Sequence, residues 1–264
     1  MKFYKIVLCA AAANLLLVGC GGKDESASPI KSAGTTLTQA NFVSTLSTAQ
    51  QDAKTSHVTM AIGVAGQQIK AEGDLAVSDK PEETAMSLTM DIGEAGMGPG
   101  TYEIRLVDEI MYLNLGAMTG DKFTKVDLKD ATNPIAKQYQ GTVDQLDPSK
   151  TLASFGDAVK SFTKAGEPIK LDGVDAQPYD VVIDTAKLKD AAAAGGAAAQ
   201  VPAELTFTFF VGPDNLPRRM TSEVSGAKIQ VDYSKWGEPV SVKAPAASEI
   251  AESSLLDKLP GAAA

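Results

Sequence analysis

Alternating apolar and polar positions dominate the chain. Between residues 58 and 115 four runs carry an apolar residue at every second position, and a period of two is typical of a strand with one buried face. The same alternation returns near the C-terminus, where the turn 212–215 breaks it once. Closely spaced strands favour antiparallel meanders. The predicted strands are 58–64, 69–77, 86–92, 102–106, 110–115, 168–171, 179–184, 205–209, 218–224 and 229–233.

Other segments have the spacing of amphipathic helices. Thr38 is a candidate N-cap for a helix over 38–52, with Phe42, Leu46 and Ala49 on one face. Asp147 and Pro148 predict the start of a second helix, which ends near Gly166. An alanine-rich helix is expected from Thr185 to 195 and another over 249–259. The apolar stripe of the second helix is Leu152, Phe155, Val159 and Phe162.

The order of these elements predicts one α+β domain over 38–264. There is no internal repeat of fixed period, and no linker within 38–259 is long enough to separate two domains.

The N-terminus has the pattern of an export signal. Lys2 and Lys5 precede an apolar run from 6 to 18, which is too short to span a membrane and reads as a signal peptide over 1–19. It ends in Leu17-Val18-Gly19-Cys20, which resembles the lipobox of bacterial lipoproteins. The expectation is a lipid-anchored protein on the extracytoplasmic face of the cell membrane, with Cys20 carrying a diacylglyceryl group. The alternative is a secreted protein whose cleavage site holds a cysteine by coincidence.

Composition narrows the possible partners. The segment 20–37 holds the lipidated cysteine and is polar and rich in small residues, so it predicts a flexible tether. Without the signal peptide the chain has 22 basic and 33 acidic residues, a net charge of −11, which argues against nucleic-acid partners. Cys9 leaves with the signal peptide, so no disulfide is expected. The pair Arg218-Arg219 is interpreted as a solvated strand start.

Candidate chemistry is sparse. His57 is the only histidine, and no HxxxH, CxxC or GxSxG motif accompanies it, so neither a metal site nor a catalytic residue nor a cofactor is predicted. His57 is expected to face solvent at the edge of the first strand. The glycine-rich stretch 93–100 lacks the Lys-Ser/Thr end of a phosphate-binding loop. A hydrolase using paired carboxylates stays open as an alternative, although no pair is nominated.

Methionine is frequent in the predicted strands. Five lie within them, at 60, 86, 90, 111 and 220, and two flank them, at 97 and 118. Methionine is flexible and polarizable, which suits a surface that accepts ligands of variable shape. The alternative interpretation is that these residues simply fill a core.

Three stretches carry a resemblance to a known family: 170–185, the strand-turn-strand 211–220 with Leu216-Pro217-Arg218-Arg219, and YSKWGEPV at 233–240. Over most of 38–245 the chain resembles the actinobacterial LppX/LprG lipoproteins, which are similar in fold to the lipoprotein carrier LolA. The resemblance implies a strongly curved antiparallel sheet, an open half-barrel wrapped over helices, enclosing an apolar cavity. It also implies a protein that binds acyl chains of envelope lipids or lipoglycans and carries them across the envelope. The expected state is a monomer, and an envelope transporter is an expected partner.

The alternation along the strands predicts which residues line that cavity. A shift of one residue in the register of a strand would turn its predicted cavity residues to the opposite face. The alternative function is an envelope interaction protein or transporter accessory with a solid core. The nominated residues are Val58, Met60, Ile62, Met86, Leu88, Met90, Ile104 and Leu106, with Leu152, Phe155, Val159 and Phe162 opposite.

Overall fold

The computed structural model describes residues 35–64, 66–78, 80–93, 100–130, 136, 156–187 and 202–251. The predicted signal peptide, Cys20 and most of the tether lie outside these residues, as do Leu152 and Phe155.

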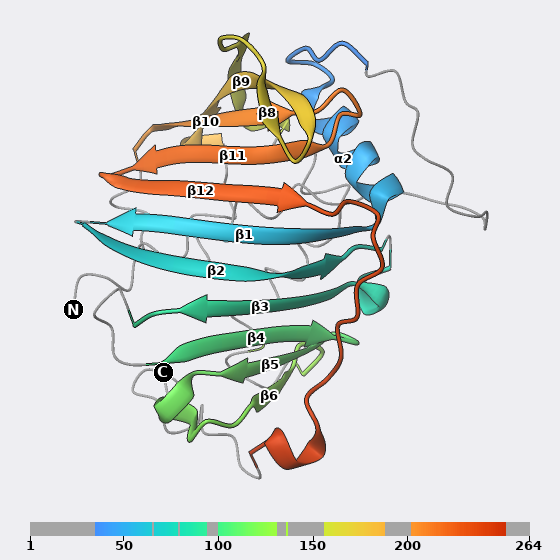
Figure 1. Ribbon diagram of the computed structural model, residues 1–264, viewed down its shortest axis with the longest axis vertical. Coiled ribbons are helices and arrows are strands. Elements are labelled where there is room, and N and C mark those ends of the chain that lie inside the picture. Colours follow the sequence, from blue (N-terminus) through green and yellow to red (C-terminus); the bar gives the residue numbers. More distant parts are fainter. Residues whose placement is uncertain are drawn as a thin grey trace.

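The described strands form one antiparallel sheet (Figure 1). Its order is β6-β5-β4-β3-β2-β1-β12-β11-β10-β9-β7, and β8 pairs with the start of β9. Ten strands had been predicted from alternation; the structure also contains β6 and β7. The bounds are β1 Thr55–Val64, β2 Gln67–Ala76, β3 Ala85–Asp91, β4 Thr101–Val107, β5 Ile110–Asn114, β6 Thr124–Asp127, β7 Val159–Lys164, β8 Ile169–Leu171, β9 Val174–Asp184, β10 Glu204–Val211, β11 Pro217–Val224 and β12 Ala227–Ser234.

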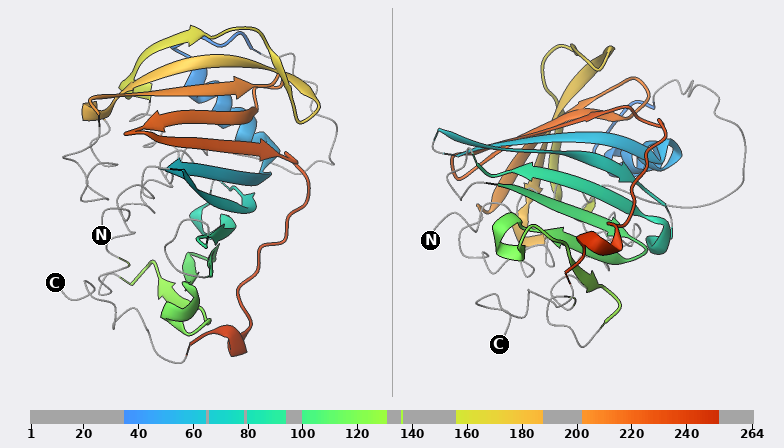
Figure 2. Two further views of the ribbon diagram at one scale, coloured as in Figure 1. Left: turned by 60° about the vertical axis from the view of Figure 1, so that its left-hand side comes forward. Right: turned by 60° about the horizontal axis from the view of Figure 1, so that its bottom comes forward.

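The centre of the sheet joins two meanders that are far apart in sequence. β1 pairs with β12 over seven residue pairs, from His57 opposite Ser234 to Gly63 opposite Lys228. Each meander continues outward from this seam, β2 to β6 on one side and β11 to β7 on the other. The sheet is curved, and the helix α2 (Phe42–Ala53) lies against its concave side (Figure 2). The predicted α+β class with a curved antiparallel sheet over helical structure is confirmed.

α2 begins later than the sequence suggested. Thr38 is not the N-cap: Asn41 holds that position, and its Oδ1 accepts a hydrogen bond from the Thr38 backbone N at 2.7 Å. The Phe42 N donates to the Thr38 carbonyl at 2.9 Å, so residues 38–41 form a turn that leads into the helix.

Two other helix predictions need correction. Val159 and Phe162 lie in β7, so the predicted helix does not extend to Gly166. At the C-terminus a 3₁₀ turn, η7 (Ala247–Glu249), precedes Ile250, which makes a parallel bridge with Phe123, so no helix begins at Glu249; residues 252–259 of that prediction lie outside the described residues. The alanine-rich segment begins with the 3₁₀ turn η5 (Thr185–Lys187), and its remainder lies outside the described residues.

After β12 the chain runs along the sheet to the β6 end (Figure 1). The Phe123 N donates to the Glu249 carbonyl at 2.8 Å, and the Ala251 N donates to the Phe123 carbonyl at 2.9 Å. Arg105 supports this segment by donating from Nη1 to the Lys243 carbonyl at 3.4 Å. Because β6 ends the sheet, these bonds occupy an edge that would otherwise be open to strand pairing.

Candidate ligand-binding face

Cross-strand register places apolar residues of many strands on the concave face. Directly paired residues in antiparallel strands share a face. One row crosses the sheet from β12 to β5 and a second runs parallel to it from β2 to β6. The first row is Tyr233, Val58, Gly73, Leu88, Ile104 and Leu113, and the second is Leu75, Met86, Leu106, Met111 and Val126.

From β1 to β6 every residue on this face is uncharged. Burial raises the pKa of the Tyr233 hydroxyl, so this phenol is neutral at physiological pH. The opposite, convex face carries ion pairs such as Arg105 with Glu103 at 2.5 Å. The two faces are therefore as different as alternation in the sequence predicts.

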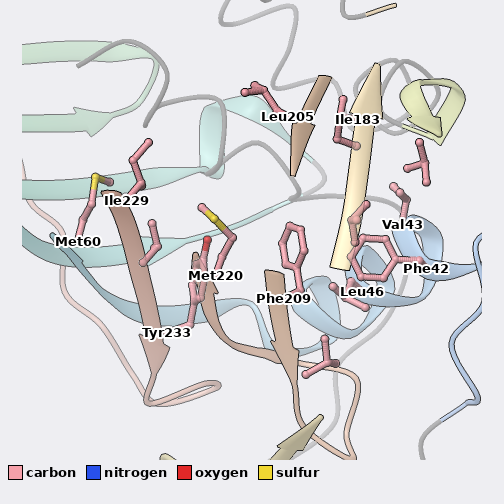
Figure 3. Packing of buried hydrophobic residues seen from close by; sticks show 14 of the residues in the cluster. Phe42, Val43, Leu46, Met60, Ile183, Leu205, Phe209, Met220, Ile229 and Tyr233 are labelled. Carbon is pink, nitrogen blue, oxygen red and sulfur yellow. The ribbon is translucent and has the colours of Figure 1, made fainter. Parts of the chain in front are cut away.

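The half of the concave face nearest α2 is filled by aromatic side chains. Phe42 of α2 is fully buried and its ring centroid lies 5.0 Å from that of Phe162 and 5.2 Å from that of Phe209. Phe162 stacks on Tyr179 at 4.9 Å. Figure 3 shows Phe42, Phe209 and Leu46 packed together between α2 and the strands. This half is named the aromatic core.

The half formed by β3 and β4 is different. Met86, Leu88, Met90 and Ile104 are only partly buried although they lie in the middle of the apolar face. Leu88 and Met90 pack against the aromatic core, whereas Met86 and Ile104 pack against a second cluster that contains Leu106, Met111, Leu113, Val126, Leu128 and Ala136. These four residues, named the β3–β4 band from here on, separate two buried clusters.

Gly73 lies on the core side of the band. It pairs with Val58 on one side and Leu88 on the other. A Cβ at this position would lie 1.9 Å from the Ser87 carbonyl oxygen and 2.9 Å from the Leu88 Cα. Only glycine allows β2 and β3 to approach this closely.

The nominated residues have the following positions. Val58, Met60, Ile62, Met86, Leu88, Met90, Ile104 and Leu106 share the concave face, with Val58, Met60, Ile62 and Leu106 buried and the other four forming the band. Val159 and Phe162 lie on the same face at the far end of the sheet, opposite Ile183 and Val181 of β9. They therefore continue the sheet instead of covering it from a helix.

The sequence analysis misplaced Arg218 but not His57. Arg218 is not solvated: only 6% of it is exposed, and its Nη2 donates to Asp214 Oδ2 at 2.6 Å. His57 lies near the start of β1, where its side chain is 25% exposed, and its Nδ1 is 2.8 Å from Asp74 Oδ1. His57 is on the convex face, apart from the band.

Removing Arg218 should destabilise the fold far more than removing its neighbour. Arg218→Ala leaves Asp214 without its partner in the β10–β11 turn, and we expect the free energy of unfolding to fall by about 2–3 kcal/mol. Arg219→Ala breaks a half-exposed pair with Asp232, with an expected cost below about 1 kcal/mol. Urea unfolding of both variants measures the difference; equal losses would contradict the role of the buried guanidinium.

Among the described residues no helix is long and apolar enough to cross a membrane. In the same ranges no three His, Cys, Asp or Glu residues are grouped so that they could hold a metal ion.

Comparison with known proteins gives weak likenesses. No family model and no curated protein matches the chain. Among solved structures, the lipoprotein LppX of Mycobacterium tuberculosis has 15% identity over 74% of this chain and 94% of its own, with a TM-score of 0.48. LprF of Mycobacterium bovis has 16% identity over 79% and 97%, also with a TM-score of 0.48. A DUF1329 family protein of Desulfovibrio piger has 11% identity over 71% and 86%, with a TM-score of 0.26.

Proposed function

We propose that this chain is a lipoprotein, anchored through Cys20 to the extracytoplasmic face of the membrane, that binds acyl chains of envelope lipids or lipoglycans on its concave face and carries them across the envelope. The observation that carries this proposal is the β3–β4 band. A row of Met, Leu and Ile residues in the middle of an uncharged face remains partly unburied between two clusters of buried residues.

The side chains of the band suit a hydrocarbon ligand. Methionine and leucine adjust their rotamers to chains of different length, and no charged group on β1 to β6 faces them. Burying about 15 methylenes stabilises a chain by roughly 12 kcal/mol relative to water. A lipid in a bilayer already has that stabilisation, so transfer to the protein is close to neutral and needs no catalytic group.

The bound lipid can be identified on protein that begins at residue 21 and therefore lacks the lipidated cysteine. This protein is exported with a signal peptide that does not lead to lipidation and is purified from its own host. Native mass spectrometry gives the stoichiometry, and organic extraction gives the identity of the lipid. A stoichiometric lipid supports the proposal. Protein that is empty and takes up no added lipid would favour the alternative, an envelope interaction protein with a solid core.

A charge in the band should abolish binding. We expect Leu88→Glu to weaken binding of a long-chain fatty acid at least tenfold, about 1.4 kcal/mol, because the carboxylate must lose water to accommodate the chain. Thr89→Glu is the matched control: the neighbouring residue is exposed and pairs with Glu72 and Glu103 on the convex face. Displacement of a fluorescent fatty acid measures both affinities. Equal affinities in the two variants would place the ligand elsewhere.

A further inference from the structure

The β8–β9 hairpin carries an exposed apolar side chain away from the body of the sheet. Ile169 is 41% exposed and, with Met118, is one of two exposed large hydrophobic residues in the described part of the chain. The hairpin register pairs Ile169 with Ala176 and Leu171 with Val174 on one face, and Lys170 with Asp175 on the other. Figure 2 shows this hairpin projecting beyond the neighbouring strands.

The N-terminal segment leaves the fold next to the β10–β11 turn. Thr35 is the first described residue, and both of its backbone polar groups meet the Asn215 side chain when that amide is oriented to satisfy them. The Asn215 amide nitrogen then donates to the Thr35 carbonyl at 3.3 Å, and its oxygen accepts from the Thr35 N at 3.2 Å. Leu37 is buried two residues later. The exit point of the tether is therefore fixed on this turn.

Arg218 lies between the turn of the β8–β9 hairpin and the β10–β11 turn that contacts Thr35. Its Nη2 donates to Asp214, which neighbours Asn215 in the β10–β11 turn, and its Nε lies 3.9 Å from Asp172 Oδ2 in the turn between β8 and β9. The turn of the hairpin that bears Ile169 thus lies close to the β10–β11 turn, on which Thr35 is fixed.

We propose that the β8–β9 hairpin is a membrane-contacting arm, with Ile169 entering the lipid surface to which Cys20 is anchored. This inference rests on the anchor in the proposed function. Fifteen Cα–Cα steps lead from Cys20 to Thr35, so the exit point lies at most about 50 Å from the anchored cysteine. A tether of this length gives a high effective concentration of membrane, so the contact at Ile169 adds to the anchor and need not hold the protein at the membrane by itself.

The experiment replaces the natural lipid anchor with a lipid that is attached chemically to Cys20. Cys20 is the only cysteine from residue 20 onward, so protein beginning there couples through it to a maleimide lipid in phosphatidylcholine vesicles that contain brominated acyl chains. Ile169→Trp is compared with Met118→Trp, whose position is 46% exposed on η4 (Gly116–Thr119), between β5 and β6. Trp236 is present in both variants as a common background.

We expect bromine to quench the tryptophan at 169 at least twofold more strongly than the tryptophan at 118, and only after coupling. Equal quenching at the two positions, or none, would overturn the arm. A second variant, Ile169→Asn, is expected to remove the preferred orientation of the tethered protein on the vesicle surface without changing its thermal unfolding temperature. Fatty-acid binding by untethered protein is measured in parallel, so failure of the arm and failure of the acyl-chain site give separate results.

Discussion

Gly73→Ala is expected to cause a larger loss of stability than any other substitution of a single small residue in the sheet. The added Cβ would lie 1.9 Å from the Ser87 carbonyl oxygen, a backbone atom that cannot rotate away. β2 and β3 must separate to relieve the overlap, so we expect the free energy of unfolding to fall by about 3–5 kcal/mol. Urea denaturation followed by circular dichroism measures the loss.

Gly63→Ala provides the control for this experiment. Gly63 also lies in a strand of the central sheet, but the nearest atom to its Cβ position is the Lys228 carbonyl oxygen at 4.0 Å. We expect a change within about 0.5–1 kcal/mol, since alanine loses less backbone entropy than glycine on folding. Similar effects of the two substitutions would show that the close approach of β2 and β3 does not require glycine.

Phe42→Ala is the second substitution with a large expected effect. Phe42 is fully buried and its ring touches Phe162 of β7 and Phe209 of β10, so it connects α2 to two strands. Truncation leaves a cavity among aromatic rings, and we expect unfolding to become easier by about 3–5 kcal/mol. Thr48→Ala, on the exposed side of α2, should change stability by less than about 0.5 kcal/mol.

Phe42→Ala and Thr48→Ala also test whether the ligand contacts only the β3–β4 band of the concave face or the aromatic half as well. Because Phe42 fills the half of the face away from the β3–β4 band, fatty-acid affinity measured at a temperature where Phe42→Ala is still folded should stay close to that of the parent. A marked loss of affinity would mean that the aromatic half also contacts the ligand.

Alternation in the sequence was sufficient to predict most strands and the side of the sheet on which their residues lie. Met86, Leu88 and Met90 recur at period two, and the register places all three on the concave face. The sequence could not distinguish the partly buried band from the buried clusters, because Met60 and Met90 have the same pattern. Their different burial depends on α2 and on the neighbouring strands, which are distant in sequence.

Two of the errors in the sequence analysis trace to β-bulges. Val159 and Phe162 are three residues apart, which favours a helix, yet a register shift between Val159 and Ser161 puts both on one face of β7. A second shift lies between Phe210 and Val211 of β10, which pair with Arg219 and Pro217, so Arg218 has no pairing partner and is buried. In both cases one extra residue changes the period that sequence analysis relies on.

The seam between β1 and β12 determines when the sheet can close. β1 begins at Thr55 and β12 ends at Ser234, so the two central strands meet only after almost all of the intervening chain is available. Pairing across such a separation closes a long loop and is intrinsically slow. The first meander can therefore form early, but its β1 edge stays unpaired until the last strand is available. Until β12 pairs with it, β1 is an edge strand whose backbone donors and acceptors are open to pairing with another chain.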